Sequence, residues 1–143
     1  MIAIKQLDAR VSEGDKERAT NSYLMSVMAL LAGAPLPIVN VAATFFFLLA
    51  YRKASYFVRW HCHQAMVSQL AVFMVNTITF WWTFSILFGN NELSNKYIAY
   101  LIVAFVFNVI EFIGTVYTMV EVRKGRHIAW WLYADITDLM VKN

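Results

Sequence analysis

Two long apolar runs dominate the second half of the chain. The run from Gln64 to Phe88 contains no Asp, Glu, Lys or Arg, and the run from Tyr97 to Val122 has Glu111 near its middle. Because an α-helix rises about 1.5 Å per residue and the hydrocarbon core of a bilayer is about 30 Å thick, each run is long enough to cross a membrane. The pattern therefore predicts two transmembrane helices joined by the polar segment 89–96.

An earlier apolar segment, residues 22–51, is interrupted by Pro35 and Pro37. Proline lacks an amide donor and restricts the residue before it, so a continuous helix is disfavoured here. The parts on either side, Ser22–Gly33 and Ile38–Tyr51, are each too short to span the bilayer core at helical rise. Two interpretations remain: one kinked span, or a hairpin of two short helices that turns at the prolines and is either re-entrant or fully crossing.

The ends of the chain are more polar than its middle. Residues 1–21 have the composition of a polar N-terminal tail, and residues 22–127 that of a helical membrane domain. Residues 128–143 are rich in Trp and Tyr with an acidic end, which suits an interfacial helix. The predicted fold class is an all-α membrane protein: two full transmembrane helices, a proline-broken helical hairpin giving three to four membrane segments, and a C-terminal interfacial helix.

The placement of the 12 Lys and Arg residues favours the hairpin. With a hairpin, eleven of them lie on the cytoplasmic side and Lys96 alone lies on the other, whereas one kinked span divides them seven to five. Cytoplasmic loops of membrane proteins are enriched in Lys and Arg. We therefore expect a multi-pass protein of the cell inner membrane with both termini in the cytoplasm.

The composition agrees with a protein whose solvent is lipid. The chain is 60% hydrophobic and 15% charged, whereas soluble domains average about 45–50% apolar and about 25% charged. Its net charge of +3 follows from basic loops and needs no nucleic-acid partner. Cys62 is the only cysteine, which excludes an internal disulfide and metal sites built on several thiolates.

One polar cluster is predicted within the membrane. A charged carboxylate is costly at the depth of Glu111, and Asn108 and Thr115 lie on the same helical face. Asn76 belongs to a comparable polar stripe on the preceding span. The cluster is either a proton or substrate site centred on Glu111 or a hydrogen-bonded contact between the two helices.

Basic and aromatic residues mark the expected membrane surface. The residues expected to contact anionic phospholipid headgroups are Arg59, Trp60, His61, Arg123, Lys124 and Arg126. His61 and His63 flank Cys62, but side chains two positions apart on a helix point in different directions, so no metal site is expected. No catalytic residue and no cofactor are expected either, because the chain carries none of the usual motifs.

The segment Phe57-Val58-Arg59-Trp60-His61-Cys62-His63-Gln64-Ala65 resembles the threshold motif of the Tic-twenty-like family, which contains a chloroplast inner-envelope import component and small bacterial relatives. The segment Glu121-Val122-Arg123-Lys124-Gly125 resembles the family's late basic exit, and the proline-broken region with Asn40 resembles its first hydrophobic segment. The chain departs from the family at Cys62, where alanine is frequent, and at Trp130-Trp131, where a Tyr-Pro pair is frequent. The resemblance implies a helical membrane fold of three to four segments and a role in protein translocation.

These observations lead to one expected function and two alternatives. We expect a non-enzymatic accessory or structural subunit of a larger membrane complex, in the translocation role that the resemblance implies. Because four short segments are too few to enclose a wide pore, protein partners or further copies of the chain are expected. One alternative is a small transporter or proton-linked carrier that uses Glu111 and the faces of Asn76 and Asn108. The other is a membrane enzyme or cofactor protein that uses His61, Cys62 and His63.

Overall fold

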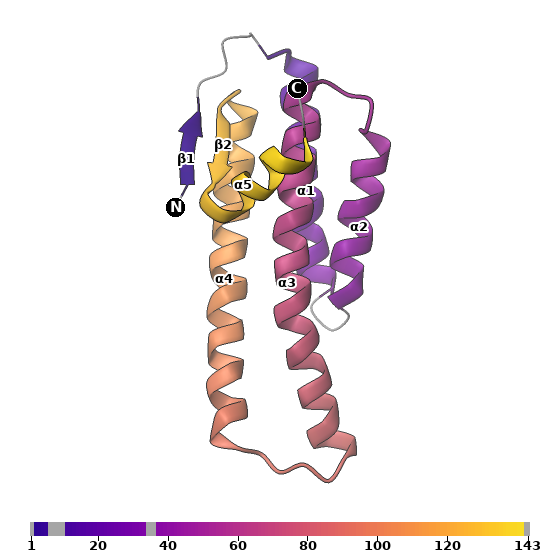
Figure 1. Cartoon of the computed structure of the whole chain (residues 1–143), viewed down its shortest axis with the longest axis vertical. Helices are drawn as coiled ribbons and strands as arrows, with labels where there is room; N and C mark the ends of the chain where they lie inside the picture. Colours follow the sequence, from indigo (N-terminus) through magenta and orange to yellow (C-terminus); the bar gives the residue numbers. More distant parts are fainter. Residues whose placement is uncertain (1, 6–10, 34–36, 142–143) are drawn as a thin grey trace.

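The computed structural model of the chain describes residues 2–5, 11–33 and 37–141. In chain order these form β1 (Ile2–Lys5), α1 (Glu13–Gly33), α2 (Pro37–Ala50), α3 (Tyr56–Phe88), α4 (Asn95–Arg123), β2 (His127–Trp130) and α5 (Trp131–Met140). Figure 1 shows α1 to α4 running lengthwise, with the two strands and α5 gathered at one end of the molecule. We refer to that end as the strand end and to the opposite end, where α3 meets α4, as the loop end.

The helices begin and end where the sequence favours it. α2 begins with Pro37, whose fixed φ suits a first helical turn and whose missing amide donor is not needed there. At the start of α4 the Ser94 hydroxyl accepts a hydrogen bond from the backbone N–H of Tyr97 at 3.2 Å. Gly125, at φ 85°, follows α4 in the left-handed region that favours glycine, and this turns the chain back toward β2.

α3 and α4 are the long elements of the fold. With 33 and 29 residues, they extend about 50 and about 43 Å, more than the hydrocarbon core of a bilayer. α1 packs against α2, α3 and α4. Figure 1 shows α1 and α2 side by side, with their lower ends beside the middle of α3, so that α3 and α4 continue beyond them toward the loop end. Residues 13–33 and 37–50 therefore form a hairpin in space, although Pro35 itself lies outside the described residues.

The two ends of the chain meet in a small antiparallel sheet. β1 pairs with β2 in the register Ile2 to Trp130, Ala3 to Ala129, Ile4 to Ile128 and Lys5 to His127. The expected polar tail of residues 1–21 thus contains a strand and the beginning of α1, which starts at Glu13. The expected interfacial helix from residue 128 is a strand up to Trp130 and becomes helical only at Trp131, because β1 offers residues 127–130 a pairing partner that the local sequence does not reveal.

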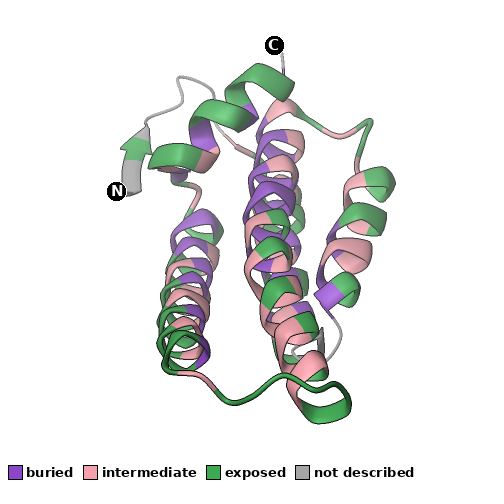
Figure 2. Ribbon diagram, turned by 60° about the horizontal axis from the view of Figure 1, so that its bottom comes forward, coloured by how far each residue is buried: buried purple, intermediate pink, exposed green. Residues whose placement is uncertain are grey.

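The buried core lies in the half of the molecule near the strand end. All buried residues of α3 fall between Phe57 and Val72 (Figure 2). One core cluster joins α1, α3, α4 and β2, and its members are Ala19, Tyr23, Phe57, Ala65, Val122 and Ile128. Toward the loop end, large apolar side chains such as Ile78 and Phe88 are exposed instead. Such exposure fits contact with lipid hydrocarbon.

The structure confirms the coarse fold prediction. The protein is helical, and α3 and α4 are long and apolar enough to cross a membrane. The number of membrane segments and their orientation stay predictions.

Candidate functional site

Glu111, the residue on which the predicted membrane site was centred, is buried and accepts two side-chain hydrogen bonds. Ser68 of α3 donates its hydroxyl proton to Oε2 at 2.7 Å, and Tyr133 of α5 donates to Oε1. Glu111 is 5% exposed. The carboxylate therefore joins three helices, because α4 supplies the acceptor while α3 and α5 supply the donors.

The Tyr133 hydroxyl is suited to this donor role. Burial raises the pKa of Tyr133 well above its usual range, and the neighbouring Glu111 carboxylate raises it further. The phenol consequently keeps its proton throughout the physiological pH range. Thr115, expected to face the same site, instead donates its hydroxyl proton to the backbone carbonyl of Glu111 at 2.6 Å and so stays within its own helix.

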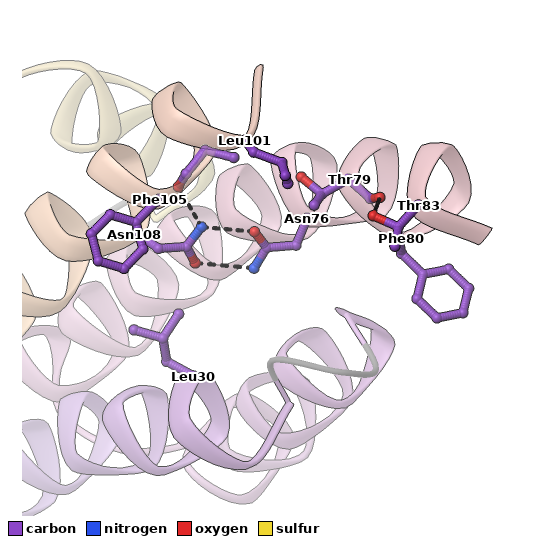
Figure 3. Close-up of a pocket in the computed structure, with 9 residues that line it drawn as sticks. Leu30, Asn76, Thr79, Phe80, Thr83, Leu101, Phe105 and Asn108 are labelled. Atoms are coloured by element: carbon purple, nitrogen blue, oxygen red, sulfur yellow. Dashed lines mark hydrogen bonds between the residues drawn. The ribbon is translucent and has the colours of Figure 1, made fainter. Parts of the chain in front are cut away.

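Asn76 and Asn108 form a separate polar contact between α3 and α4. Asn76 Nδ2 donates to Asn108 Oδ1 at 3.0 Å, and Asn108 Nδ2 donates to Asn76 Oδ1 at 2.7 Å (Figure 3). Asn108 Nδ2 also donates to the Ala104 carbonyl at 2.8 Å. The reciprocal amide pair fixes the spacing of the two long helices in the half of the molecule where few side chains are buried.

The predicted site residues do not share one cavity. A groove of about 460 Å³ runs beside the amide pair, and its lining residues are Leu30, Asn76, Thr79, Phe80, Thr83, Leu101, Ala104, Phe105 and Asn108. Glu111 lines a different cavity of about 280 Å³, together with residues of α5 such as Tyr133. Thr115 lines neither. The polar face predicted along α4 is thus divided into a carboxylate contact and an amide contact.

Two residues expected at the lipid headgroups are buried inside the protein. Trp60 and His61 are each 0% exposed, because β2 and α5 pack over the start of α3. Trp60 Nε1 donates to Asp138 Oδ1 of α5 at 2.7 Å. The sequence pattern predicts Trp60 and His61 at the bilayer surface. In the structure the C-terminal segment covers both side chains instead.

The remaining basic residues of the predicted lipid contact are more accessible. Lys124 and Arg126 both pair with the Glu121 carboxylate, and Arg123 lies 3.6 Å from Glu13 Oε2. Their side chains are 55%, 53% and 51% exposed, respectively. Arg59 is half-buried, and its carbonyl accepts a hydrogen bond from His63 Nδ1 at 2.7 Å. Contact of these residues with lipid stays a prediction.

The structure also contains a polar network that the sequence did not predict, centred on Gln64. Its Nε2 donates to the Tyr23 hydroxyl at 2.8 Å and to the Ile128 carbonyl at 3.0 Å. Its Oε1 accepts from the Trp130 backbone N–H at 2.9 Å. A single buried amide thus connects α3 to α1 and to two backbone groups, the Ile128 carbonyl and the Trp130 N–H, on one edge of β2.

The network continues through two imidazoles. The Tyr23 hydroxyl lies 2.8 Å from His61 Nδ1, and His61 Nε2 lies 3.2 Å from His127 Nδ1. Tyr23, His61 and His127 thus form a continuous chain of groups that can each donate or accept a hydrogen bond. The signal for this network is the spacing of His61 and Gln64, one helical turn apart at the start of a long apolar run.

Trp130 fits into a space that a glycine provides. The Trp130 indole N–H donates to the Thr118 hydroxyl at 2.6 Å. A Cβ added at Gly114 would lie 2.7 Å from the edge of the indole ring. α4 therefore needs glycine at position 114 for β2 to lie against it, and this close approach is the structural reason for glycine in an otherwise bulky helix.

The arrangement offers no obvious catalytic or metal centre in the parts that the structure describes. Among residues 2–5, 11–33 and 37–141, no three His, Cys, Asp or Glu side chains gather where they could hold a metal ion. Cys62 is 2% exposed and lies against Ser22 of α1, and His61 is 0% exposed. Neither side chain is accessible to a substrate in this conformation.

A comparison with protein families corrects the resemblance drawn from the sequence. Residues 17–136 match the model of MamF_MmsF, described as the magnetosome magnetite crystal formation protein family. No curated protein and no solved structure matches the chain. The assignment to the Tic-twenty-like family is therefore wrong, and the expected role in protein translocation, which depended on it, loses its support. The short motifs that suggested it are explained by packing, since Trp60, His61 and Gln64 bind β2 and α5.

Proposed function

The chain belongs to the MamF/MmsF magnetosome magnetite crystal formation family, and on that premise we propose that it is a small, non-enzymatic membrane protein that acts in magnetite crystal formation at the magnetosome membrane. The observation that carries the proposal is the family match over residues 17–136, which takes in nearly all of the helical bundle. Its two membrane-length helices, α3 and α4, agree with a membrane protein.

The use of the polar side chains supports a structural role. Glu111, Gln64 and the Asn76–Asn108 pair all direct their hydrogen-bonding atoms at other parts of the chain. Polar groups within a bilayer stabilise helix contacts when they are paired in this way. The proton-linked carrier centred on Glu111 is less favoured, because both of its carboxylate oxygens are already engaged by Ser68 and Tyr133.

The pairing of β1 with β2 supports the predicted orientation. Exposed backbone of a strand pair is unfavourable in hydrocarbon, so the sheet lies on one side of the membrane. Residues 2–5 and 127–130 consequently share a side, in line with the cytoplasmic placement of both termini that the positive-inside pattern predicts. The exposed loop with Asn90, Asn91 and Glu92 then faces the compartment that holds the crystal.

The surface suggests the remaining partners. Arg123, Lys124 and Arg126 are half exposed near the strand end, where they are placed to meet anionic phospholipid headgroups. The exposed apolar side chains of α3 and α4 are placed to meet the bilayer. A larger membrane complex or further copies of the chain are also proposed, because few side chains are buried toward the loop end.

Deletion and complementation in the source bacterium test the proposal. We expect deletion to change the size or shape distribution of magnetite crystals in electron micrographs, and the wild-type gene to restore it. Fractionation should place the protein in purified magnetosome membranes. Unchanged crystals in the deletion strain, or a protein confined to another membrane, would refute the proposal.

A further inference from the structure

Among the residues that the structure describes, two buried amide side chains carry polar atoms without a hydrogen-bond partner. Asn40 of α2 is 0% exposed, and neither its Nδ2 nor its Oδ1 has a partner. Gln69 of α3 is 1% exposed, and its Oε1 has no partner. An unsatisfied buried donor or acceptor destabilises a fold by about 1 to 3 kcal/mol, so these three atoms call for an occupant that satisfies them.

The helix registers bring these two amides together. Cys62 of α3 lies against Ser22 of α1, and α1 and α3 run in the same direction (Figure 1). Seven residues further along, on the same face of each helix, Gln69 and Ala29 are at one level. Asn40 reaches that level from α2, since Ala29 lies about one turn before the end of α1 and Asn40 about one turn after the start of α2.

The geometry of α2 and α3 also puts Asn40 and Gln69 at a similar level. α2 and α3 are antiparallel and packed together, joined by residues 51–55. Counted from the middle of that connection, Asn40 and Gln69 differ by about one helical turn. Asn40 belongs to the buried face of α2, which also includes Pro37 and Thr44. Ala29, which faces this level from α1, is 4% exposed and has a small side chain.

We propose that Asn40 and Gln69 form a polar site at the junction of α1, α2 and α3 that binds water. The chemistry of the unpartnered atoms selects the ligand. Asn40 offers an NH₂ donor, which disfavours a cation, and the two amide oxygens disfavour an anion. A water molecule donates two hydrogen bonds and accepts up to two, so it can serve two carbonyl acceptors and the amide donor together. This water fixes the α1–α2 hairpin against α3.

Magnetisation transfer from water to side-chain amides tests the site directly. In detergent-solubilised protein labelled with ¹⁵N at Asn and Gln, the Asn40 NH₂ protons should show a dipolar cross-peak to water although the residue is fully buried. Gln64 is the matched control, because it is also buried but both of its amide protons donate to protein acceptors. Absence of the cross-peak at Asn40, or equal cross-peaks at both residues, would overturn the proposal.

A double-mutant cycle gives a second, independent measurement. If water links the two amides, Asn40→Leu and Gln69→Leu each lower the folding equilibrium constant about tenfold, because each removes a partner of the water. The double variant should lose much less than the product of the two effects. Thr44→Val is the control, since that hydroxyl bonds only to carbonyls of its own helix, and it should show no coupling to Gln69→Leu. Single variants that are more stable than wild type, with additive effects, would show that the amides share no ligand.

Discussion

At the scale of single residues, the fold depends on a few close contacts between α4 and the segment that follows it. Gly114 admits the Trp130 indole, and Glu111 accepts the Tyr133 hydroxyl. Both contacts hold the C-terminal segment against the bundle, and each can be removed by a small substitution that has a matched control elsewhere in the chain.

Gly114→Ala should destabilise the protein by about 1 to 3 kcal/mol, because the new methyl group forces the indole away from α4. The Trp130 bond to Thr118 should lengthen, which a change in tryptophan emission would report. Gly14→Ala is the control, since a Cβ there meets no atom within 4 Å. Equal stability of Gly114→Ala and wild type in detergent unfolding would contradict the packing described here.

Tyr133→Phe should cost about 1 to 3 kcal/mol of unfolding free energy, because it removes a donor from a buried carboxylate. Tyr117→Phe removes the same hydroxyl from a tyrosine that is 43% exposed and should be nearly neutral. Denaturant titration of both variants in the same detergent measures the difference. Similar values for the two would mean that Glu111 does not depend on Tyr133.

At the scale of elements, α3 has two halves with different surroundings. The half near the strand end is enclosed by protein, and the half near the loop end carries exposed apolar side chains. Gln64 lies in the enclosed half and bonds two backbone groups on one edge of β2. The attachment of β2 to α3 should therefore depend on this amide, whereas α5 has further contacts through Tyr133 and Asp138.

Gln64→Leu should loosen β2 without unfolding the transmembrane helices. Hydrogen exchange at the Trp130 amide should accelerate at least tenfold, since its acceptor is removed. Helical content measured by circular dichroism should stay close to wild type. Ser85→Ala is the control, because the Ser85 hydroxyl bonds only to a carbonyl of its own helix and its loss should leave exchange at Trp130 unchanged.

The same division explains what could be predicted from the sequence. The uncharged run after Gln64 and the run around Glu111 predict α3 and α4, because a helix in hydrocarbon needs a long stretch of apolar residues and this is visible in the local sequence. The sequence does not predict that Trp60 and His61 are buried, since their cover comes from residues about 70 positions later in the chain. The depth of Glu111 in its apolar run predicts a polar site there, but its partner Tyr133 lies beyond a turn that local sequence patterns do not predict.

At the scale of the whole molecule, the sheet and the basic residues predict one orientation. Cys62 is the only cysteine and is 2% exposed, so the wild-type chain provides a nearly unreactive background for labelling. In purified, intact magnetosomes, Lys53→Cys at the strand end should react with a membrane-impermeant maleimide because it faces the cytoplasm. Asn91→Cys at the loop end should react only after the magnetosome membrane is permeabilised. Reaction of Asn91→Cys, but not Lys53→Cys, in intact magnetosomes would reverse the proposed orientation.

The pairing of residues 2–5 with residues 127–130 also sets an order for biogenesis. Residues 2–5 leave the ribosome long before residues 127–130 have been synthesised. They therefore have no strand partner while the helices are inserted. The strand pair closes only when translation is nearly complete. A nascent chain arrested before His127 should therefore expose its amino terminus to protease, whereas the finished protein protects it.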